Sequence, residues 1–501
     1  MDIKLNKAAL RDKIYACWVG KNIGGTMGAP YEGTQEIQDI HGYNSPKGEP
    51  LPNDDLDLQL VWLTAMEQVG PKELHANILA DYWLSYIPPH WNEYGTGKSN
   101  LKMGLLPPLS GEFRNEAWKH SNGAWIRSEI WACLAPGFPN IAIKYAYMDA
   151  SIDHGVSEGT YGEIFTAALE SLAFIESDIR TVIEKALTYI PADCKVAKCV
   201  RMVLEEYDKK TPWQTLRQML VEENADIGWF QAPANIAYVI LGLMYGEGDF
   251  LQSLIYSINC GDDTDCTGAT CGAILGILNG TKGIPKDLSE YIGDRIIMVA
   301  ADNSYTLLPK TCTELTDRVL KMIPTVLKSN GSVMHNGKEM GIYLEYTDGE
   351  DEYDKEAILS VLEKPIDCYR DPCVAEMKEV MQYGPYCFEI ATCPYINAVV
   401  QYEEEPVVKP LKDFKVRVYL KNLRKDPYYV KFKVFLPEGW TADYDRNVHL
   451  THFTLYNETP RASWEMTIHV GEHIEEINKV TVWAEGSTHP LPLLLPLVLL
   501  G

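Results

Sequence analysis

Two groups of acidic residues, far apart in the chain, each come directly before a stretch with helical periodicity. The first occupies residues 53–55 of "LPNDDLDLQLVWL", and the second occupies residues 262–265 of "CGDDTDCTGATCGAILG". A single acidic residue suffices to cap a helix, because its carboxylate accepts hydrogen bonds from the free N–H groups of the first turn. Adjacent carboxylates repel each other unless a positive charge lies between them. The two groups therefore indicate either solvated helix caps or ligands of a divalent cation.

The residues after the second group favour a buried position for it. Residues 267–276 are small or apolar and include Gly268 and Gly272. Such a helix face lets a neighbouring helix approach closely, so we expect the start of this helix to lie deep in its domain. Carboxylates in a protein interior need a cation partner. Asp263 and Asp265 can point to the same side, and Mg²⁺ and Mn²⁺ prefer carboxylate oxygens.

Two further segments could lie beside such a site. "GKNIGGTMGAPYEG", residues 20–33, is rich in glycine and carries Glu32, but it lacks the GxxxxGK[ST] pattern of a phosphate-binding loop. Taken alone, Glu32 is the kind of acidic residue found on a protein surface. "IPPHWNEYGTGKSN", residues 87–100, is predicted to be a surface loop with partly buried aromatic residues, with a loop that stacks on a flat ring over a pocket as the alternative.

The elements that must position these residues change character along the chain. From Lys7 to Leu327 apolar residues recur with the spacing of one helix face, which predicts a large all-α domain at residues 1–329. Residues 413–501 alternate between apolar and polar positions and are rich in β-branched and aromatic residues, which predicts a β-sandwich of Ig-like type. Residues 330–412 are predicted to be a mixed connecting region. The final "HPLPLLLPLVLLG" is shorter than the roughly 20 residues of a membrane span and reads as a buried strand.

The composition is that of a folded globular protein with an acidic surface. Forty-five Lys and Arg residues stand against 70 Asp and Glu residues, and the resulting net charge of −25 opposes binding to nucleic acid. Residues 1–20 lack the continuous apolar stretch of a signal peptide, and the 12 cysteines show no zinc or disulfide spacing. We therefore expect a cytoplasmic protein with reduced thiols and no membrane partner.

Over residues 8–305 the chain resembles the ADP-ribosylglycohydrolases, because motifs similar to theirs occur in the family's order. "GGTMGAPYEG" is similar to the GDxxGxxxE motif, which puts Glu32 at the position of a metal-linked glutamate. "NDDLDLQL" is similar to the T/S-D-D-T motif, which puts Asn53, Asp54 and Asp55 at metal-binding positions.

The second acidic group carries the same resemblance. "CGDDTDCTGA" is similar to the family's G-G-D-T-D-T-x-G-A. This likeness puts Asp263 and Asp265 at the positions of ligand aspartates, and it puts Cys266 at the position of a ligand threonine.

Two more segments resemble parts of the family that contact substrate. "SNGAWIR" is similar to the S/G-N-G-A-x-x-R loop, and "DHGVSEG" is similar to the T-H-x-x-x-E segment. The resemblance implies that the substrate-binding residues are Ser121, Asn122, Gly123, Arg127 and His154. Considered without the family, the serine, asparagine and glycine form an ordinary turn triplet, the arginine suits an internal ion pair, and the histidine suits a structural hydrogen bond.

The resemblance implies an orthogonal all-α fold whose centre holds two Mg²⁺ or Mn²⁺ ions. It also implies cleavage of the bond between ribose C1″ of ADP-ribose and an acceptor, in a small-molecule or ADP-ribosylated substrate. Cations held by carboxylates can orient the ribose diol and a water molecule, and they stabilise the charge that develops as the bond breaks. Glu32, Asp54 and Asp55 are the expected catalytic residues, with Glu32 or a second carboxylate transferring the proton.

The chain departs from the family pattern at five positions. Gly25 stands where the family usually has Asp, and Asn53 stands where it has Thr or Ser. Leu56 and Cys266 each stand where the family has Thr, and Asp262 stands where it has Gly. An amide oxygen remains a suitable ligand, whereas a thiol is a soft donor for a hard cation, so the centre could hold one ion rather than two, with Asp262 as a compensating oxygen donor. Two alternatives follow: a glycosidase for a non-nucleotide sugar, or a non-catalytic protein that binds ADP-ribose or a sugar. The sequence does not indicate the oligomeric state.

Overall fold

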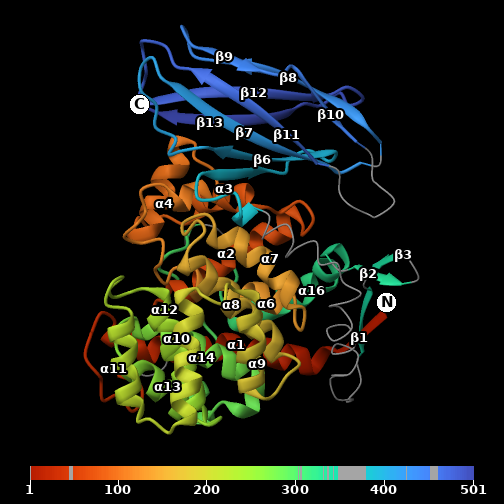
Figure 1. Ribbon diagram of the computed structural model, residues 1–501. Helices are drawn as coiled ribbons and strands as arrows, with labels where there is room; N and C mark the ends of the chain where they lie inside the picture. The colour runs from red at the N-terminus through yellow and green to blue at the C-terminus, as the bar shows by residue number, and fades with distance from the viewer. Residues whose placement is uncertain are drawn as a thin grey trace.

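The computed structural model has a helical part followed by two stacked β sheets (Figure 1). It describes residues 2–44, 49–302, 304, 307–330, 332–335, 338–341, 343–347, 380–424, 426–451 and 461–501. The predicted order, helical domain first and β region second, is confirmed. The Ig-like type of the β region and the boundaries after residues 329 and 412 stay predictions.

Helices account for most of the described chain before residue 331. The α-helices are α1 (Lys7–Gly28), α2 (Asp54–Val69), α3 (Ala76–Tyr86), α4 (Asn92–Met103), α5 (Leu109–Glu112), α6 (Glu129–Leu134), α7 (Pro139–Ala150), α8 (Glu158–Ala173), α9 (Ile179–Ala186), α10 (Lys195–Asp208), α11 (Trp213–Glu223), α12 (Ala232–Tyr245), α13 (Phe250–Asn259), α14 (Thr264–Asn279), α15 (Lys286–Ile292) and α16 (Cys312–Asn330). The 3₁₀ helices are η1 (Ala29–Tyr31), η2 (Trp125–Arg127), η3 (Leu187–Tyr189) and η4 (Thr281–Gly283). Their apolar faces share one core, in which Trp62 stacks on Trp83 and Trp131.

Helices α1 and α14 cross with their backbones in direct contact. A Cβ atom on Gly24 would lie 1.9 Å from the carbonyl oxygen of Gly268, and one on Gly28 would lie 2.1 Å from the carbonyl oxygen of Thr264. Real side-chain carbons do not approach backbone oxygens so closely, so only glycine fits at these crossing points. The contact brings the C-terminal end of α1, followed by η1 and Glu32, to the N-terminal end of α14, where the second acidic group lies.

The prediction of a loop over residues 87–100 is wrong from Asn92 onward, where α4 begins. The glycines of this segment suggested turns in the sequence, whereas in the structure they allow close packing. A Cβ on Gly97 would lie 3.0 Å from the Cβ of Asp153. Tyr94 and Leu101 are buried on the helix face that points into the core.

The described strands lie in four sheets. They are β1 (Asp2–Asn6), β2 (Ser332–His335), β3 (Lys338–Gly341), β4 (Tyr343–Thr347), β5 (Cys387–Ile390), β6 (Ile396–Tyr402), β7 (Asp413–Asn422), β8 (Tyr428–Phe435), β9 (Thr441–Tyr444), β10 (Asn447–Leu450), β11 (Arg461–His469), β12 (Ile477–Gly486) and β13 (Leu493–Leu500). A five-stranded sheet in the order β5-β6-β7-β11-β9 packs on a four-stranded sheet in the order β10-β8-β12-β13, and Phe432 of one sheet stacks on Trp464 of the other. Both sheets are antiparallel. Two small two-stranded sheets, β1-β4 and β2-β3, complete the set.

The alternation of buried and exposed residues along these strands explains the sandwich. Strand β7 buries every second residue, and the final apolar run forms β13 at a sheet edge, where Pro496 is exposed and removes no hydrogen bond from a central strand. Strands β5 and β6 come before Asp413 and still pair in the larger sheet. Residues 348–379 of the predicted connecting region lie outside the described residues.

The β sandwich is anchored to the segment between α4 and α5. Leu105, Leu109 and Phe113 belong to the core of the sandwich, and Pro108 forms a backbone bridge with Phe388. This contact supports α4 from one end. None of the helices in the described ranges combines the length and the apolar character that crossing a membrane requires.

We expect Gly24→Ala to destabilise the protein by about 3 kcal/mol, because the added Cβ meets backbone atoms that cannot move aside without separating α1 from α14. Gly42→Ala is the matched control, since a Cβ there has nothing within 4 Å. Denaturant unfolding followed by circular dichroism measures both variants. Equal midpoints for the two variants would contradict the direct helix contact.

Candidate metal centre

The start of α14 presents two buried aspartates to the rest of the site. Asp263 and Asp265 are 6% and 7% exposed. Asp263 Oδ2 accepts a hydrogen bond of 2.7 Å from Asn122 Nδ2, and Asn122 Oδ1 in turn accepts one of 3.0 Å from Trp125 Nε1. Asp265 Oδ1 is buried and has no hydrogen-bond partner. The close α1–α14 contact thus carries ionisable groups into the interior, as predicted from the small residues.

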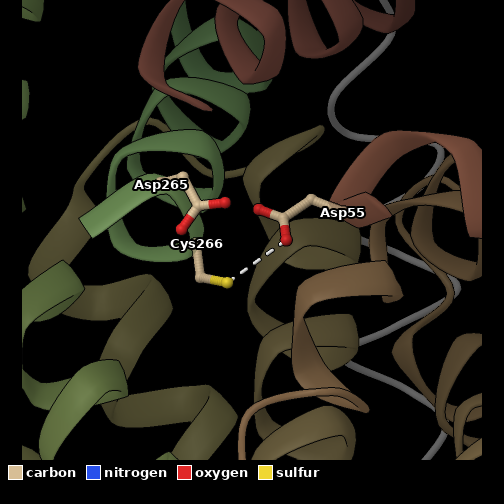
Figure 2. A group of neighbouring side chains, drawn as sticks. All are labelled: Asp55, Asp265 and Cys266. Atoms are coloured by element: carbon tan, nitrogen blue, oxygen red, sulfur yellow. Dashed lines mark hydrogen bonds between the residues drawn. The ribbon is translucent and has the colours of Figure 1, made fainter. Parts of the chain in front are cut away.

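One cluster joins α14 to α2. Figure 2 shows Asp55, Asp265 and Cys266 pointing toward one another from these two helices. Their ligand atoms all lie within 4.8 Å of one another. Cys266 Sγ donates to Asp55 Oδ1 at 3.2 Å, whereas Asp55 Oδ2 is buried without a partner. The structure therefore brings the two acidic groups of the sequence together.

A second cluster joins α14 to the end of η1. Ligand atoms of Glu32, Asp263 and Asp265 lie within 4.8 Å of one another, and Glu32 is the exposed member. Asp265 belongs to both clusters. The arrangement could hold a divalent cation at either cluster or at both, with carboxylate oxygens as the main donors.

The carboxylates repel one another in the absence of a cation. The negative charge of Asp265, followed by burial, raises the pKa of Glu32 to about 7. Burial, followed by the charge of Asp265, raises the pKa of Asp54 to about 6. Burial also raises the pKa of Asp55 and of Asp263 well above the usual range. Each of these shifts marks a place where a positive charge would stabilise the ionised form.

The remaining residues of the first acidic group have other contacts. Asn53 Oδ1 accepts a hydrogen bond of 2.8 Å from the backbone N–H of Asp55 and so caps α2. Asp54 is half-buried, and its Oδ2 accepts a hydrogen bond of 3.0 Å from the hydroxyl of Tyr94. Asp57 Oδ2 accepts backbone N–H groups of residues 299–301 and holds that segment in place. Metal ligation by Asn53 and Asp54 stays a prediction.

Asp262 shapes the turn before α14. Its φ is +68°, and its two carboxylate oxygens accept hydrogen bonds from the backbone N–H of Phe230, while Oδ2 also accepts one of 2.8 Å from Asn235 Nδ2. Asp262 is in neither carboxylate cluster of the described residues. These contacts fix the turn before α14, from which Asp265 faces Asp55 of α2 and Asp263 faces Glu32.

The clusters open into a cavity of about 460 Å³. Its lining comprises Ala29, Glu32, Pro52, Asp54, Trp91, Asn92, Glu93, Tyr94, Trp118, Ser121, Asn122, Gly123, Ile126, Phe230, Asp263, Asp265, Cys266 and Val299. Of the sequence-predicted site residues, Asn53, Asp55, Arg127 and His154 lie outside this lining.

Comparison with known proteins fits these motifs and this geometry. The family model described as ADP-ribosylglycohydrolase matches residues 6–319. The chain belongs to the ADP-ribosylglycohydrolase family. The resemblance predicted from the motifs is therefore confirmed, and membership supports a glycohydrolase.

Individual relatives of this ADP-ribosylglycohydrolase family member are distant. An uncharacterised protein of Archaeoglobus fulgidus is 23% identical over 305 residues, which cover 57% of this chain and 93% of that protein. A solved structure titled an ADP-ribosylglycohydrolase-related protein complex is 19% identical, with a TM-score of 0.45, and covers 63% of this chain and 99% of its own. A FixG-related protein from Vibrio parahaemolyticus is 7% identical, with a TM-score of 0.18, and covers 22% of this chain and 96% of its own.

Two departures from the ADP-ribosylglycohydrolase pattern occupy the same space. A Cβ on Gly25 would lie 2.0 Å from Asn53 Nδ2. Glycine at position 25 therefore leaves room for the amide of Asn53, which a side chain at position 25 would displace. Asn53, which is larger than the usual Thr or Ser, is accommodated by Gly25, which is smaller than the usual Asp.

Arg127 and His154 lie behind the cavity wall rather than in it. Arg127 is 0% exposed: its guanidinium binds Asp149 and Asp153 at 2.9 Å each and donates to the carbonyl oxygen of Gly123 at 2.6 Å. His154 Nδ1 lies 2.8 Å from Asp153, and its Nε2 lies 3.2 Å from Ser121 Oγ. The two residues hold the loop that carries Ser121, Asn122 and Gly123. The internal ion pair and the structural histidine, which the sequence left open, match these contacts.

Several cavity residues were not identified from the sequence. Glu93, Tyr94, Trp118 and Phe230 line the cavity, and none belongs to a motif. Glu93 is buried, and burial raises the pKa of its carboxyl group. The only signal was the aromatic composition of residues 87–100, which by itself does not say where the segment lies.

We expect Arg127→Met to destabilise the protein by about 3 to 5 kcal/mol, because it leaves Asp149 and Asp153 buried without their cation. Arg295→Met is the matched control, because its ion pair with Glu49 is exposed and contributes about 1 kcal/mol or less. Thermal and denaturant unfolding measure both. An Arg127→Met protein with unchanged stability and a raised KM would instead indicate a direct substrate contact.

Proposed function

We propose that this protein is a divalent-metal-dependent glycohydrolase that cleaves an ADP-ribosyl or related glycosyl N- or O-linkage. The reaction consumes one water molecule. The bond between the anomeric carbon and the leaving atom breaks, the water oxygen bonds to the anomeric carbon, and a proton passes to the leaving atom. Family membership supports the reaction class, and the clustered carboxylates support the metal dependence.

The donor set fits a divalent cation. Asp55 Oδ2 and Asp265 Oδ1 are buried without hydrogen-bond partners, which is costly for carboxylate oxygens unless a cation binds them. Asp55 and Asp265 would hold one Mg²⁺ or Mn²⁺ ion beside the Cys266 thiol, and Glu32, Asp263 and Asp265 would hold a second. The pair of unpartnered buried oxygens is the observation that carries the proposal.

Bound Mg²⁺ or Mn²⁺ would supply Lewis-acid stabilisation of the charge that develops at the glycosidic bond. The residues of this chain contribute positioning and proton transfer. Asn122 orients Asp263 by its hydrogen bond, and the Gly123 loop forms one wall. Glu32 lies at the exposed rim of the cavity, where one of its carboxylate oxygens can face a cation at the second cluster while the other accepts or gives up a proton. We assign proton transfer to Glu32.

We expect Asp55→Asn and Asp265→Asn to abolish the rise in thermal stability that Mn²⁺ or Mg²⁺ gives the unaltered protein, because each removes a buried charged ligand. Asn122→Ala should weaken cation binding by about tenfold to 100-fold, the usual effect of losing a partner that orients a ligand. Isothermal titration calorimetry measures the affinities.

Asp81→Asn is the control, because Asp81 is exposed on α3. It should leave cation binding and glycoside hydrolysis unchanged. Cation affinity that survives both Asp55→Asn and Asp265→Asn would refute the metal centre, and hydrolysis that persists in chelator would refute its catalytic role.

We expect cation binding to strengthen as the pH rises from about 5 to about 8. The raised pKa values of Glu32 and Asp54 mean that the folded, cation-free protein binds more protons than the unfolded chain, so these groups favour folding at low pH and less so as the pH rises through about 6 to 7. A cation must displace these protons. Thermal unfolding should therefore show a larger Mn²⁺-induced stabilisation at pH 8 than at pH 5.5. A pH-independent stabilisation would contradict the protonated carboxyls.

A further inference from the structure

We propose that the substrate group bound in the cavity is a neutral glycoside without phosphate groups. This proposal rests on the proposed glycohydrolase function and concerns only what that site accepts. It departs from the ADP-ribosyl group that the family's name suggests. The cavity itself carries the argument, through its charges, the helix ends that face it and its aromatic walls.

The lining of the cavity carries carboxylates and no cationic side chain. Five acidic residues contribute to it, and no Lys, Arg or His does so among the described residues: Glu32, Asp54, Glu93, Asp263 and Asp265. Even two divalent cations would leave the formal charge of the ionised lining at −1. A diphosphate would therefore enter a region of like charge, whereas binding sites for phosphate usually provide Arg, Lys or free N–H groups.

Several basic side chains in segments around the cavity have partners outside it. Arg127 binds Asp149 and Asp153 behind the wall, and Lys21 is fully buried with Glu129 at 2.6 Å. Lys119 pairs with Glu112 and Glu116, and Arg217 donates to the backbone carbonyls of Gln35 and Cys260. Burial and the charge of Lys119 lower the pKa of His120 to about 4, so it is neutral at pH 7. These partners hold the five side chains away from a phosphate in the cavity.

The helix ends at the cavity also offer no site for phosphate. A helix N-terminus binds anions through free N–H groups and its partial positive charge. The first turn of α2 carries Asp54 and Asp55, that of α4 carries Glu93, and that of α14 carries Asp265. At each of these helices, a carboxylate in the first turn thus offsets the partial positive charge of the N-terminus.

The other surfaces of the cavity suit a sugar ring. Trp91, Tyr94, Trp118 and Phe230 contribute aromatic rings to the lining, and Trp91 is 46% exposed with its ring centroid 6.1 Å from that of Tyr94. Aromatic faces pack against the apolar C–H face of a sugar, while carboxylates and amides such as Asn92 and Asn122 accept or donate hydrogen bonds to its hydroxyl groups. A neutral glycoside uses both kinds of surface.

The test compares substrates that differ in charge, using the full chain saturated with Mn²⁺. The panel contains p-nitrophenyl ribofuranosides of both anomers, their 5-phosphates, other neutral p-nitrophenyl furanosides and pyranosides, and ADP-ribosyl-arginine. We expect a neutral member to be cleaved with a kcat/KM at least about tenfold above any phosphorylated member, since one like charge in the site costs a factor of this order. A phosphorylated or ADP-ribosylated member that is cleaved as well as the best neutral one overturns the proposal.

Binding separates this proposal from the glycohydrolase function. Calorimetry with ADP-ribose and excess Mn²⁺ should give no binding tighter than about 10 μM, and a Kd below that overturns the neutral-substrate proposal whatever the turnover. Cation binding without cleavage of any glycoside in the panel refutes the glycohydrolase function instead, and the neutral-substrate proposal falls with it.

A variant probes the aromatic wall. Trp91→Ala should raise KM for the neutral glycoside about two- to tenfold while leaving the preference over its phosphate unchanged, because Trp91 supplies contact area and no charge. Tyr429→Ala, which removes an exposed ring on the β sandwich, should leave KM unchanged. An unchanged KM in Trp91→Ala contradicts stacking in this cavity.

Discussion

The backbone contact between α1 and α14 determines where every other part of the site lies. Gly24 meets Gly268 and Gly28 meets Thr264 at distances that exclude a side chain, so the two helix axes come as close as two helices can. This contact sets the start of α14 beside the end of α1, and it leaves Asp263 and Asp265 only 6% and 7% exposed at the wall of the cavity. A wider crossing would leave room for solvent, and the same aspartates would then be ordinary helix caps. The helix packing therefore places carboxylates close together in the interior, where a bound cation would stabilise their ionised forms.

Burying several carboxylates together has consequences for the surrounding structure. Neutral hydrogen-bond donors stabilise two of the buried carboxylates: Asn122 donates to Asp263, and Cys266 donates to Asp55. Proton uptake lowers the repulsion between the other carboxylates, as the raised pKa values of Glu32 and Asp54 indicate. Among the carboxylate oxygens of the two clusters, Asp55 Oδ2 and Asp265 Oδ1 are buried and left without a partner. Behind the wall, Arg127 and its two aspartates form a separate network of ion pairs, in which the guanidinium holds the Gly123 loop and does not face the cavity.

The sequence predicted the helical domain, the β region and the meeting of the two acidic groups, because these depend on periodicity and on short motifs whose own residues are adjacent in the chain. It could not determine the roles of Arg127 and His154. The role of Arg127 depends on Asp149 and Asp153, which are 22 and 26 residues away, and that of His154 depends on Ser121, which is 33 residues away. Glu93 was missed for a similar reason: residues 87–100 contain two prolines, two glycines and two asparagines and so resemble a loop, whereas Gly97 serves close packing against Asp153. Side-chain partners across long sequence distances are set by tertiary structure, and local patterns do not encode them.

The departures from the family pattern form a compatible set rather than a loss of the site. Gly25 leaves the space that the Asn53 amide fills, and Asn53 then caps α2 and so orients the N–H of Asp55. The Cys266 thiol has its pKa raised well above the usual range by burial and the neighbouring carboxylates, so it stays protonated and donates to Asp55, as a threonine hydroxyl could. Asp262 accepts hydrogen bonds from Phe230 and Asn235 and so stabilises the turn before α14. Random decay of a disused site would leave collisions and unpaired groups at these positions. Here Gly25, Asn53, Asp262 and Cys266 fit their neighbours, and the two cluster oxygens without a partner, Asp55 Oδ2 and Asp265 Oδ1, are oxygens that a cation would bind.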